Sequence, residues 1–210
     1  MTDELIFYTN PMSRGQIVRW MLEEVGRPYE TRIIGYDEMG GDAYRAVNPM
    51  MKVPAIVHDG RVVTECAAII AYLADVFPDS VLAPRDDEKA DYYRWLFFAA
   101  GPLEQALTSK TLGFTPTAEQ GRSVGFGDLD RTVETLAAHL AGRDYVCGSR
   151  FAAADVYVGS HVMWGMAFGT LPAHPSFEAY AARLEPREAY RRGKEIDNGL
   201  IAEMKAASPA

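Results

Sequence analysis

Cysteine is scarce in this sequence, and long apolar runs are missing. Only Cys66 and Cys147 occur among the 210 residues, which excludes a fold held together by disulfide bonds. No Cys-x-x-Cys pair or Cys/His spacing indicates zinc, so we expect no metal site. The longest apolar window, Val156–Leu171, is interrupted by Ser160 and His161 and is shorter than a membrane span. These absences favour a reduced cytoplasmic protein that does not cross a membrane.

Positive charge is also in deficit. Lysine and arginine number 21 against 29 acidic residues, which gives a formal net charge of −8. This balance argues against general binding to nucleic acid or to anionic membranes, although a local basic pocket can still hold a small anion. The chain begins Met-Thr-Asp-Glu, which is acidic and unlike a signal peptide. A hydrophobic content of 48% supplies enough apolar surface for one large or two small domains.

The first 80 residues alternate between strand and helix patterns. Four short apolar segments have the length and composition of strands: 5–8, 31–34, 54–57 and 61–63. Asp59-Gly60 predicts a tight turn between the last two, and helices are expected over 13–25 and from 65 to Pro78. A strand–helix–strand unit needs a parallel pair, whereas the hairpin adds antiparallel strands. The pattern therefore predicts a small mixed sheet flanked by helices.

The remainder of the chain has helical periodicity. Residues 154–168 are apolar on all sides, as in a helix enclosed by others. Pro102 is expected to kink or break the helix in which it lies. The expected organisation is an α/β domain followed by an all-α helical bundle, with the two parts at residues 1–80 and 89–210 and a linker at 81–88.

The segment Asn10-Pro11-Met12-Ser13-Arg14 follows the first predicted strand and opens a helix. Ligands of open α/β sheets gather outside such strand ends, and helix N-termini attract anions through their free N–H groups. Ser13 has two compatible explanations. It caps the helix in a capping box with Gln16, or it donates a hydrogen bond to a ligand.

Two further segments carry polar groups at comparable places. Val53-Pro54 opens a strand, and its peptide bond is either an ordinary trans bond or a cis bond that frees the Val53 backbone for a peptide-like ligand. Lys52 is either an exposed loop lysine or a cation for a carboxylate. Glu65 and Cys66 begin a helix. Glu65 is either simply favoured there by the helix dipole or binds an ammonium group of a ligand. The three segments together suit a short acidic peptide with a central anionic group.

Motifs spread over almost the whole chain resemble the cytosolic glutathione transferase family, in its serine-type bacterial and fungal members. They are PMSR with LEE (11–14, 22–24), NPMMKVPAI (48–56), ECAAIIAYL (65–73) and FAAAD (151–155). The resemblance implies a thioredoxin-like domain followed by an α-helical domain, usually in a homodimer. It also implies glutathione as co-substrate, with no metal, and a role in detoxification.

The resemblance assigns a role to each candidate residue. Ser13 donates a hydrogen bond to the glutathione sulfur, which favours the reactive thiolate. Val53, before a cis Pro54, pairs through its backbone with the cysteinyl unit, and Lys52 meets the glycyl carboxylate. Glu65, with the start of its helix, holds the γ-glutamyl end. The second substrate is then a small hydrophobic electrophile near the aromatic segment 92–98.

Three positions depart from the family pattern. Cys66 stands where a serine usually binds the γ-glutamyl carboxylate, and a thiol is a weaker donor. Ala152 replaces a capping serine, which costs its helix about 1 kcal/mol unless Asp155 compensates. In the tyrosine-type classes the catalytic tyrosine aligns nearer Asn10 than Tyr8, so Asn10 is the second candidate for contacting the sulfur.

The expected reaction is attack of the glutathione thiolate on the electrophile, and two alternatives stay open. One is glutathione-dependent reduction of disulfides or peroxides in the same pocket. Because residues 10–14 contain no cysteine, such chemistry would use the sulfur of glutathione itself. The other alternative is a non-catalytic binding module, which the unusual Cys66 motivates.

Overall fold

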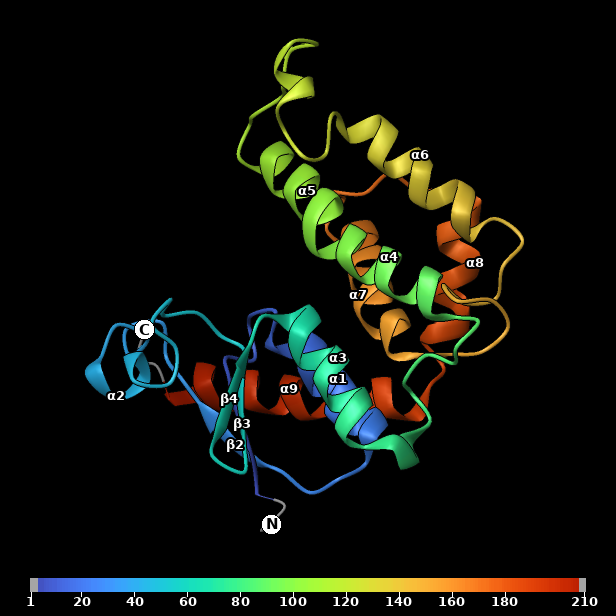
Figure 1. Cartoon of the computed structure of the whole chain (residues 1–210). Helices are drawn as coiled ribbons and strands as arrows, with labels where there is room; N and C mark the ends of the chain where they lie inside the picture. Colours follow the sequence, from blue (N-terminus) through green and yellow to red (C-terminus); the bar gives the residue numbers. More distant parts are fainter. Residues whose placement is uncertain (1–3, 208–210) are drawn as a thin grey trace. The chain divides into compact units, whose positions relative to one another are not determined.

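A computed structural model describes residues 4–207. The chain forms two compact units, the first made of Met1–Val81 with Arg187–Ala210 and the second of Leu82–Pro186 (Figure 1). Within the described range, none of the helices combines the length and apolarity needed to cross a membrane.

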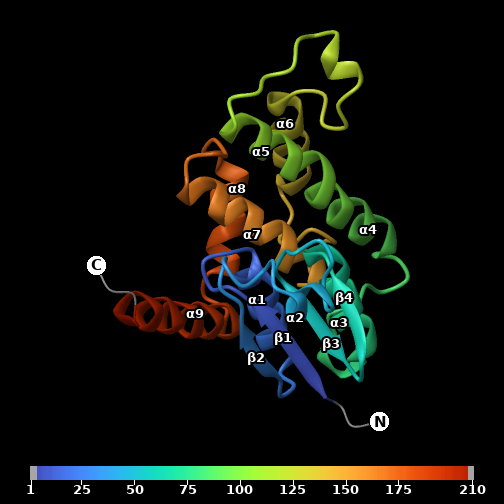
Figure 2. The same cartoon turned by 90° about the vertical axis from the view of Figure 1, so that its left-hand side faces the viewer.

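The first unit contains a four-stranded mixed sheet (Figure 2). Its strands are β1 (Leu5–Thr9), β2 (Glu30–Ile33), β3 (Ala55–His58) and β4 (Arg61–Thr64), in the order β2-β1-β3-β4. β1 runs parallel to β2, whereas β3 is antiparallel to both β1 and β4. The predicted parallel pair and hairpin are therefore confirmed. β1 is buried along its whole length, as its continuous apolar run requires.

The first unit also contains helices. They are α1 (Gly15–Val25), α2 (Asp42–Arg45), α3 (Cys66–Val76) and α9 (Glu188–Ala207), with a short 3₁₀ turn η1 (Pro78–Ser80) after α3. α1 ends as predicted at Gly26, which takes a left-handed φ of 70° and donates its N–H to Leu22 O at 3.0 Å. α1 and α3 pack against each other, and fully buried Val18 and Ile69 belong to the core that they form over β1.

The second unit is helical throughout. Its elements are α4 (Lys89–Phe98), η2 (Ala99–Leu103), α5 (Glu104–Thr111), η3 (Gln120–Arg122), α6 (Leu129–Leu140), α7 (Ala153–Ala167) and α8 (Pro175–Leu184). η2 is a π-helical turn that contains Pro102, so the chain passes from α4 to α5 through a wide turn where the sequence predicts a break. α7 is buried almost throughout, as the central helix of a bundle must be. The expected helical bundle is confirmed.

The start of α7 shows how the missing capping serine is compensated. Ala152 has no side-chain oxygen, but the Asp155 carboxylate accepts the Ala152 N–H at 2.8 Å. The same carboxylate accepts the Val146 N–H at 2.8 Å and the Tyr180 hydroxyl at 2.7 Å. Burial, followed by the charge of Asp155, raises the pKa of Tyr180 well above its usual value. Asp155 therefore ties the helix start to two other parts of the bundle.

The C-terminal helix does not join the bundle. The sequence-based division assigned residues 89–210 to one helical domain, whereas α9 packs against α1 in the first unit (Figure 2). Helical periodicity identifies a helix but does not reveal which distant surface its apolar side covers, and this accounts for the difference.

A buried ion pair joins the two helices. Arg19 Nε on α1 lies 3.2 Å from Asp197 Oδ1 on α9, and both side chains are 2% exposed. Arg19 Nη1 also donates to Tyr29 Oη at 3.0 Å and to Thr31 Oγ1 at 2.8 Å. Burial raises the pKa of the Asp197 carboxyl, while the Arg19 guanidinium opposes that shift.

Asp197→Ala leaves the Arg19 charge buried without its carboxylate. We expect it to lower the free energy of unfolding by about 3–5 kcal/mol in urea denaturation followed by circular dichroism. The double variant Arg19→Met/Asp197→Leu keeps apolar volume and buries no charge, so its loss is expected to be much smaller. A double variant as unstable as Asp197→Ala would contradict this account.

Candidate functional site

The three candidate segments meet at one end of the sheet because of its register. Tyr8 on β1 lies opposite Ala55 on β3, and Ala55 lies opposite Thr64 on β4. The turn that follows β1, the Val53-Pro54 segment before β3 and the Glu65-Cys66 segment after β4 are therefore neighbours. The sequence placed each segment at a sheet edge or helix start, and the pairing brings them together.

Asn10 organises the turn after β1. Its Nδ2 donates to Ile34 O at 3.0 Å, and its Oδ1 accepts the Met12 N–H at 3.0 Å. The residue is 0% exposed. A side chain that is fully buried and bonded at both ends shapes the turn, as asparagine commonly does. The Asn10 side chain therefore lies in the interior, beneath the exposed residues of the turn.

Ser13 lies at the start of α1, half-buried. Its Oγ accepts the Gly15 N–H at 3.0 Å and donates to Asn10 O at 2.7 Å. The predicted capping box is wrong: Ser13 Oγ binds the N–H of Gly15 and not that of Gln16, the N-cap of α1 is Arg14, and Gln16 Nε2 donates to Pro11 O at 2.6 Å. The Ser13 hydroxyl is therefore held at a helix N-terminus with its hydrogen on a carbonyl of the same turn.

Gly15 permits a close approach between α1 and β1. A Cβ at this position would lie 1.9 Å from Thr9 Oγ1 and 3.1 Å from Thr9 Cβ, so any larger residue requires the Thr9 side chain or the backbone to shift. Since Gly15 is the residue whose N–H reaches Ser13 Oγ, this packing also fixes the position of the serine.

The Val53-Pro54 peptide bond is cis, as the resemblance implied. Lys52 O, just before it, accepts Tyr44 Oη at 2.6 Å and Asn48 Nδ2 at 2.8 Å. Within residues 4–207, neither the N–H nor the C=O of Val53 has a hydrogen-bond partner. This half-buried backbone therefore offers one donor and one acceptor to an extended peptide.

Glu65 and Lys52 carry the charged side chains of the site. Glu65 is exposed and has a φ of 66°, a conformation that is uncommon for a non-glycine residue and concentrates at functional sites. Lys52 is also exposed, and no carboxylate of the described residues forms an ion pair with it. Together with the N-termini of α1 and α3, Lys52 gives this edge a positive character inside an acidic protein.

Cys66 is the first residue of α3 and is 8% exposed. Its Sγ lies 3.8 Å from Arg14 O, so the thiol connects the start of α3 to the Ser13 turn. Cys66 thus packs as a small buried side chain. Among the described residues, no cluster of histidine, cysteine and acidic side chains is suited to a metal ion.

The aromatic segment 92–98 divides between core and surface. Tyr92, Trp95 and Leu96 are each 1% exposed and belong to the core of the second unit. Tyr93 and Phe97, one helical turn apart on α4, are 48% and 65% exposed. Only this second pair can offer a broad apolar contact to another molecule.

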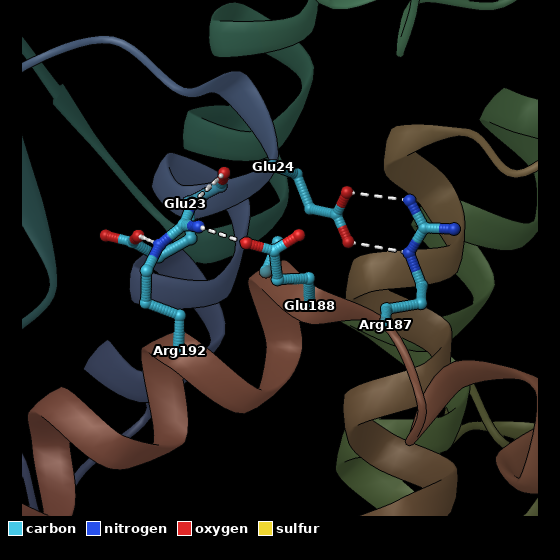
Figure 3. A pocket seen from close by; sticks show the side chains of 6 residues that line it. Glu23, Glu24, Arg187, Glu188 and Arg192 are labelled. Atoms are coloured by element: carbon cyan, nitrogen blue, oxygen red, sulfur yellow. Dashed lines mark hydrogen bonds and ion pairs between the residues drawn. The ribbon is translucent and has the colours of Figure 1, made fainter.

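A polar pocket lies between α1 and α9, away from these segments in the sequence (Figure 3). Its charged side chains neutralise one another: Arg187 forms two hydrogen bonds with Glu24, both at 2.7 Å, and Arg192 binds Glu23. Trp20 Nε1 donates to Glu24 as well, at 2.8 Å. These contacts fasten the beginning of α9 to the last turn of α1.

Comparison with known proteins agrees with the geometry. Residues 12–76 match the family model of the glutathione S-transferase N-terminal domain. Glutathione S-transferase GstA of Escherichia coli O157:H7 is 34% identical over 135 residues, which cover 60% of this chain and 64% of the relative. The match thus spans slightly less than two thirds of that relative. The chain is therefore similar to glutathione S-transferases, and residues 12–76 match the N-terminal domain of that family.

Solved structures of the family extend the similarity over most of the chain. A theta class glutathione S-transferase from Xanthomonas axonopodis pv. citri with glutathione bound is 28% identical, with a TM-score of 0.71 over 91% of this chain and 97% of its own. A sphingomonad glutathione S-transferase complexed with glutathione is 26% identical, with a TM-score of 0.74 over 92% of this chain and 98% of its own.

Several residues that hold the candidate site in shape were not predicted from the sequence. Tyr36 Oη donates to Met12 O at 3.0 Å, and Tyr44 and Asn48 hold Lys52 O. Asn48-Pro49 was a readable turn signal, since an asparagine oxygen commonly accepts the N–H two residues on, here that of Met50 at 3.0 Å. Neither tyrosine carried a comparable local signal.

Gly15→Ala is expected to lower the free energy of unfolding by about 1–3 kcal/mol, because the added methyl overlaps Thr9 Oγ1. The double variant Gly15→Ala/Thr9→Ala removes that oxygen and is expected to regain most of the loss. Gly199→Ala is the matched control on α9, where an added Cβ meets nothing within 4 Å. Thermal and urea denaturation measure all three; equal stability of the Gly15 and Gly199 variants would contradict the packing argument.

Proposed function

We propose that this chain is a glutathione transferase that activates the glutathione thiol for attack on a small hydrophobic electrophile. In the reaction the thiol loses its proton, a sulfur–carbon bond forms, and the leaving group departs from the electrophile with its bonding electrons. The observation that carries the proposal is the Ser13 hydroxyl at the N-terminus of α1, beside a Val53 backbone that can pair with a peptide.

The ligand can be laid over the site group by group. The cysteinyl unit of glutathione pairs with the N–H and C=O of Val53, as an added strand would. The glycyl carboxylate meets Lys52, and the γ-glutamyl ammonium meets the exposed Glu65. The γ-glutamyl carboxylate faces the start of α3, where Cys66 supplies a backbone N–H in place of a serine hydroxyl.

Ser13 then changes its hydrogen-bond partner. Its hydrogen, which now reaches Asn10 O at 2.7 Å, turns to the sulfur, while Oγ keeps the Gly15 N–H. A neutral bond is exchanged for a charge-assisted one, worth about 1.5–3 kcal/mol, so the pKa of the bound thiol falls by about one to two units. Asn10 holds the turn through its bonds to Ile34 O and the Met12 N–H and does not contact the sulfur.

The two alternatives gain nothing specific from the site. Reduction by the sulfur of glutathione would use the same Ser13 turn and Val53 backbone, so the geometry gives it no separate support. Neither free cysteine of the protein adds to it, since Cys66 is buried and Cys147 belongs to the other unit. Burial raises the pKa of Cys147 to about 12, which keeps that thiol protonated and unreactive. A purely binding role would use the Val53 backbone and Lys52, and it would leave the Ser13 hydroxyl with only its structural bonds to the Gly15 N–H and Asn10 O. We place the reaction in the reducing cytoplasm, where two free thiols persist.

Ser13→Ala is expected to lower kcat/KM for glutathione and a nitroaromatic acceptor about ten-fold or more, because the thiolate loses its donor. Ser149→Ala, on an exposed loop of the second unit, is the matched control and is expected to behave as the parent protein. Calorimetric titration comes first: no detectable heat with millimolar glutathione would overturn the enzyme function. Unchanged kinetics in Ser13→Ala would instead remove Ser13 from its role.

We further propose that the chain acts as a homodimer, supported by the exposed apolar residues of each unit. Tyr93 and Phe97 form an apolar stripe on α4. In the first unit Met50 is 68% exposed and Val62, on the edge strand β4, is 46% exposed. A second copy of the chain would cover such side chains.

Phe97→Glu is expected to shift the protein from dimer to monomer in light scattering after size-exclusion chromatography, because a charge would be buried at the contact. Phe168→Glu, 75% exposed at the end of α7, is the matched control and is expected to remain dimeric. A monomeric parent protein would contradict the proposal. A Phe97→Glu variant with unchanged mass but weakened use of the electrophile would assign Phe97 to the acceptor site.

A further inference from the structure

We propose that the C-terminal helix positions the Ser13 turn through Lys194 and Gln16, so that Lys194 is a positioning residue for thiolate formation. Lys194 Nζ on α9 donates to Gln16 Oε1 on α1 at 3.2 Å, and Gln16 Nε2 donates to Pro11 O at 2.6 Å. These two bonds form a continuous path from α9 to the turn that carries the serine. The proposal rests on the proposed function only for its catalytic consequence.

The chemistry of the two partners fixes the orientation of the Gln16 amide. An ammonium can only donate and a carbonyl can only accept, so Oε1 must face Lys194 and Nε2 must face Pro11. The lysine charge also polarises the amide, which strengthens the bond from its N–H₂ group to Pro11 O. Without Lys194 only Pro11 O orients the amide, and the unpolarised bond to Pro11 is weaker.

Lys194 is itself held in place by the packing of α9. Lys194 and Asp197 lie three residues apart and hence on one face of the helix, as Gln16 and Arg19 do on α1. Asp197 is held to Arg19 by the buried ion pair, and Gly193 lies so near α1 that an added Cβ would be 3.5 Å from the Trp20 backbone. The packing of α9 on α1 therefore fixes the backbone of Lys194 at a place from which its ammonium reaches Gln16.

The turn is held at several points, which include the bonds of Ser13 Oγ to Asn10 O and to the Gly15 N–H. Besides the Asn10 side chain, Tyr36 Oη binds Met12 O, and Ser13 N–H binds Asn10 O at 3.1 Å. Pro11 lacks an N–H, so its carbonyl is the only backbone group through which that residue can be anchored. Losing the Gln16 bond therefore loosens the segment directly before Ser13 and lets the hydroxyl drift from the position in which it meets the sulfur.

The test compares Lys194→Met, Gln16→Met and their double variant, with Lys205→Met as the matched control on an exposed part of α9. Amide hydrogen exchange is measured without glutathione over residues 12–16. Both single variants are expected to raise exchange about ten-fold in this segment, with that of β1 unchanged. The double variant is expected to match Gln16→Met alone, because Lys194 acts through Gln16.

Activity supplies the second readout. In both single variants the pH profile of conjugation is expected to move up by about half a unit or more, and kcat to fall with little change in KM for glutathione. Exchange or a pH profile in Lys194→Met equal to that of Lys205→Met would overturn the proposal, as would additive effects in the double variant. If the parent protein binds no glutathione, the proposed function fails, and hydrogen exchange alone then decides whether Lys194 positions the turn.

Discussion

The ion pair between Arg19 and Asp197 is the interaction on which the first unit depends. One guanidinium bonds to α9, to Tyr29 and to Thr31, and it lies 4.9 Å from the centre of the Phe7 ring. It thereby connects α1, α9 and two strands at a single buried point. Any other docking of α9 would leave a charge without its partner in an apolar interior, which costs far more than a shifted apolar contact. The pair thus selects one arrangement of the helix.

The position of the site follows from that arrangement. α1 lies between the sheet and α9, so its first turn is fixed on one side by the close contact of Gly15 with Thr9 and on the other by Lys194. The same edge of the sheet brings the start of α3 and the Val53 backbone alongside through strand register. An anionic peptide can bind an acidic protein here because helix N-termini and Lys52 supply local positive potential.

Local rules predicted much of this structure. The αL position of Gly26, the Asp59-Gly60 turn with φ values of 47° and 77°, and the compensation by Asp155 all follow from neighbouring residues in the chain. The failures share one cause. Gln16 was assigned to a capping box with Ser13, yet its amide lies between Pro11 and Lys194, a residue 178 positions away. Likewise, residues 89–210 were assigned to one helical domain although α9 packs against α1, because the contact that decides its place is long-range.

The contribution of both chain ends to one unit has an energetic consequence. Residues 4–81 contain the sheet, α1, α3 and every proposed glutathione contact, but they also contain Arg19, whose carboxylate partner lies on α9. A chain that stopped before α9 would leave this guanidinium beside an uncovered apolar surface, and Glu23 and Glu24 would lose Arg192 and Arg187. The candidate site therefore depends on the last helix for its structural support, although none of the proposed glutathione contacts is made by that helix. The first unit is therefore defined by the ion pair between Arg19 and Asp197, which joins two distant parts of the chain, and not by the linker predicted from the sequence.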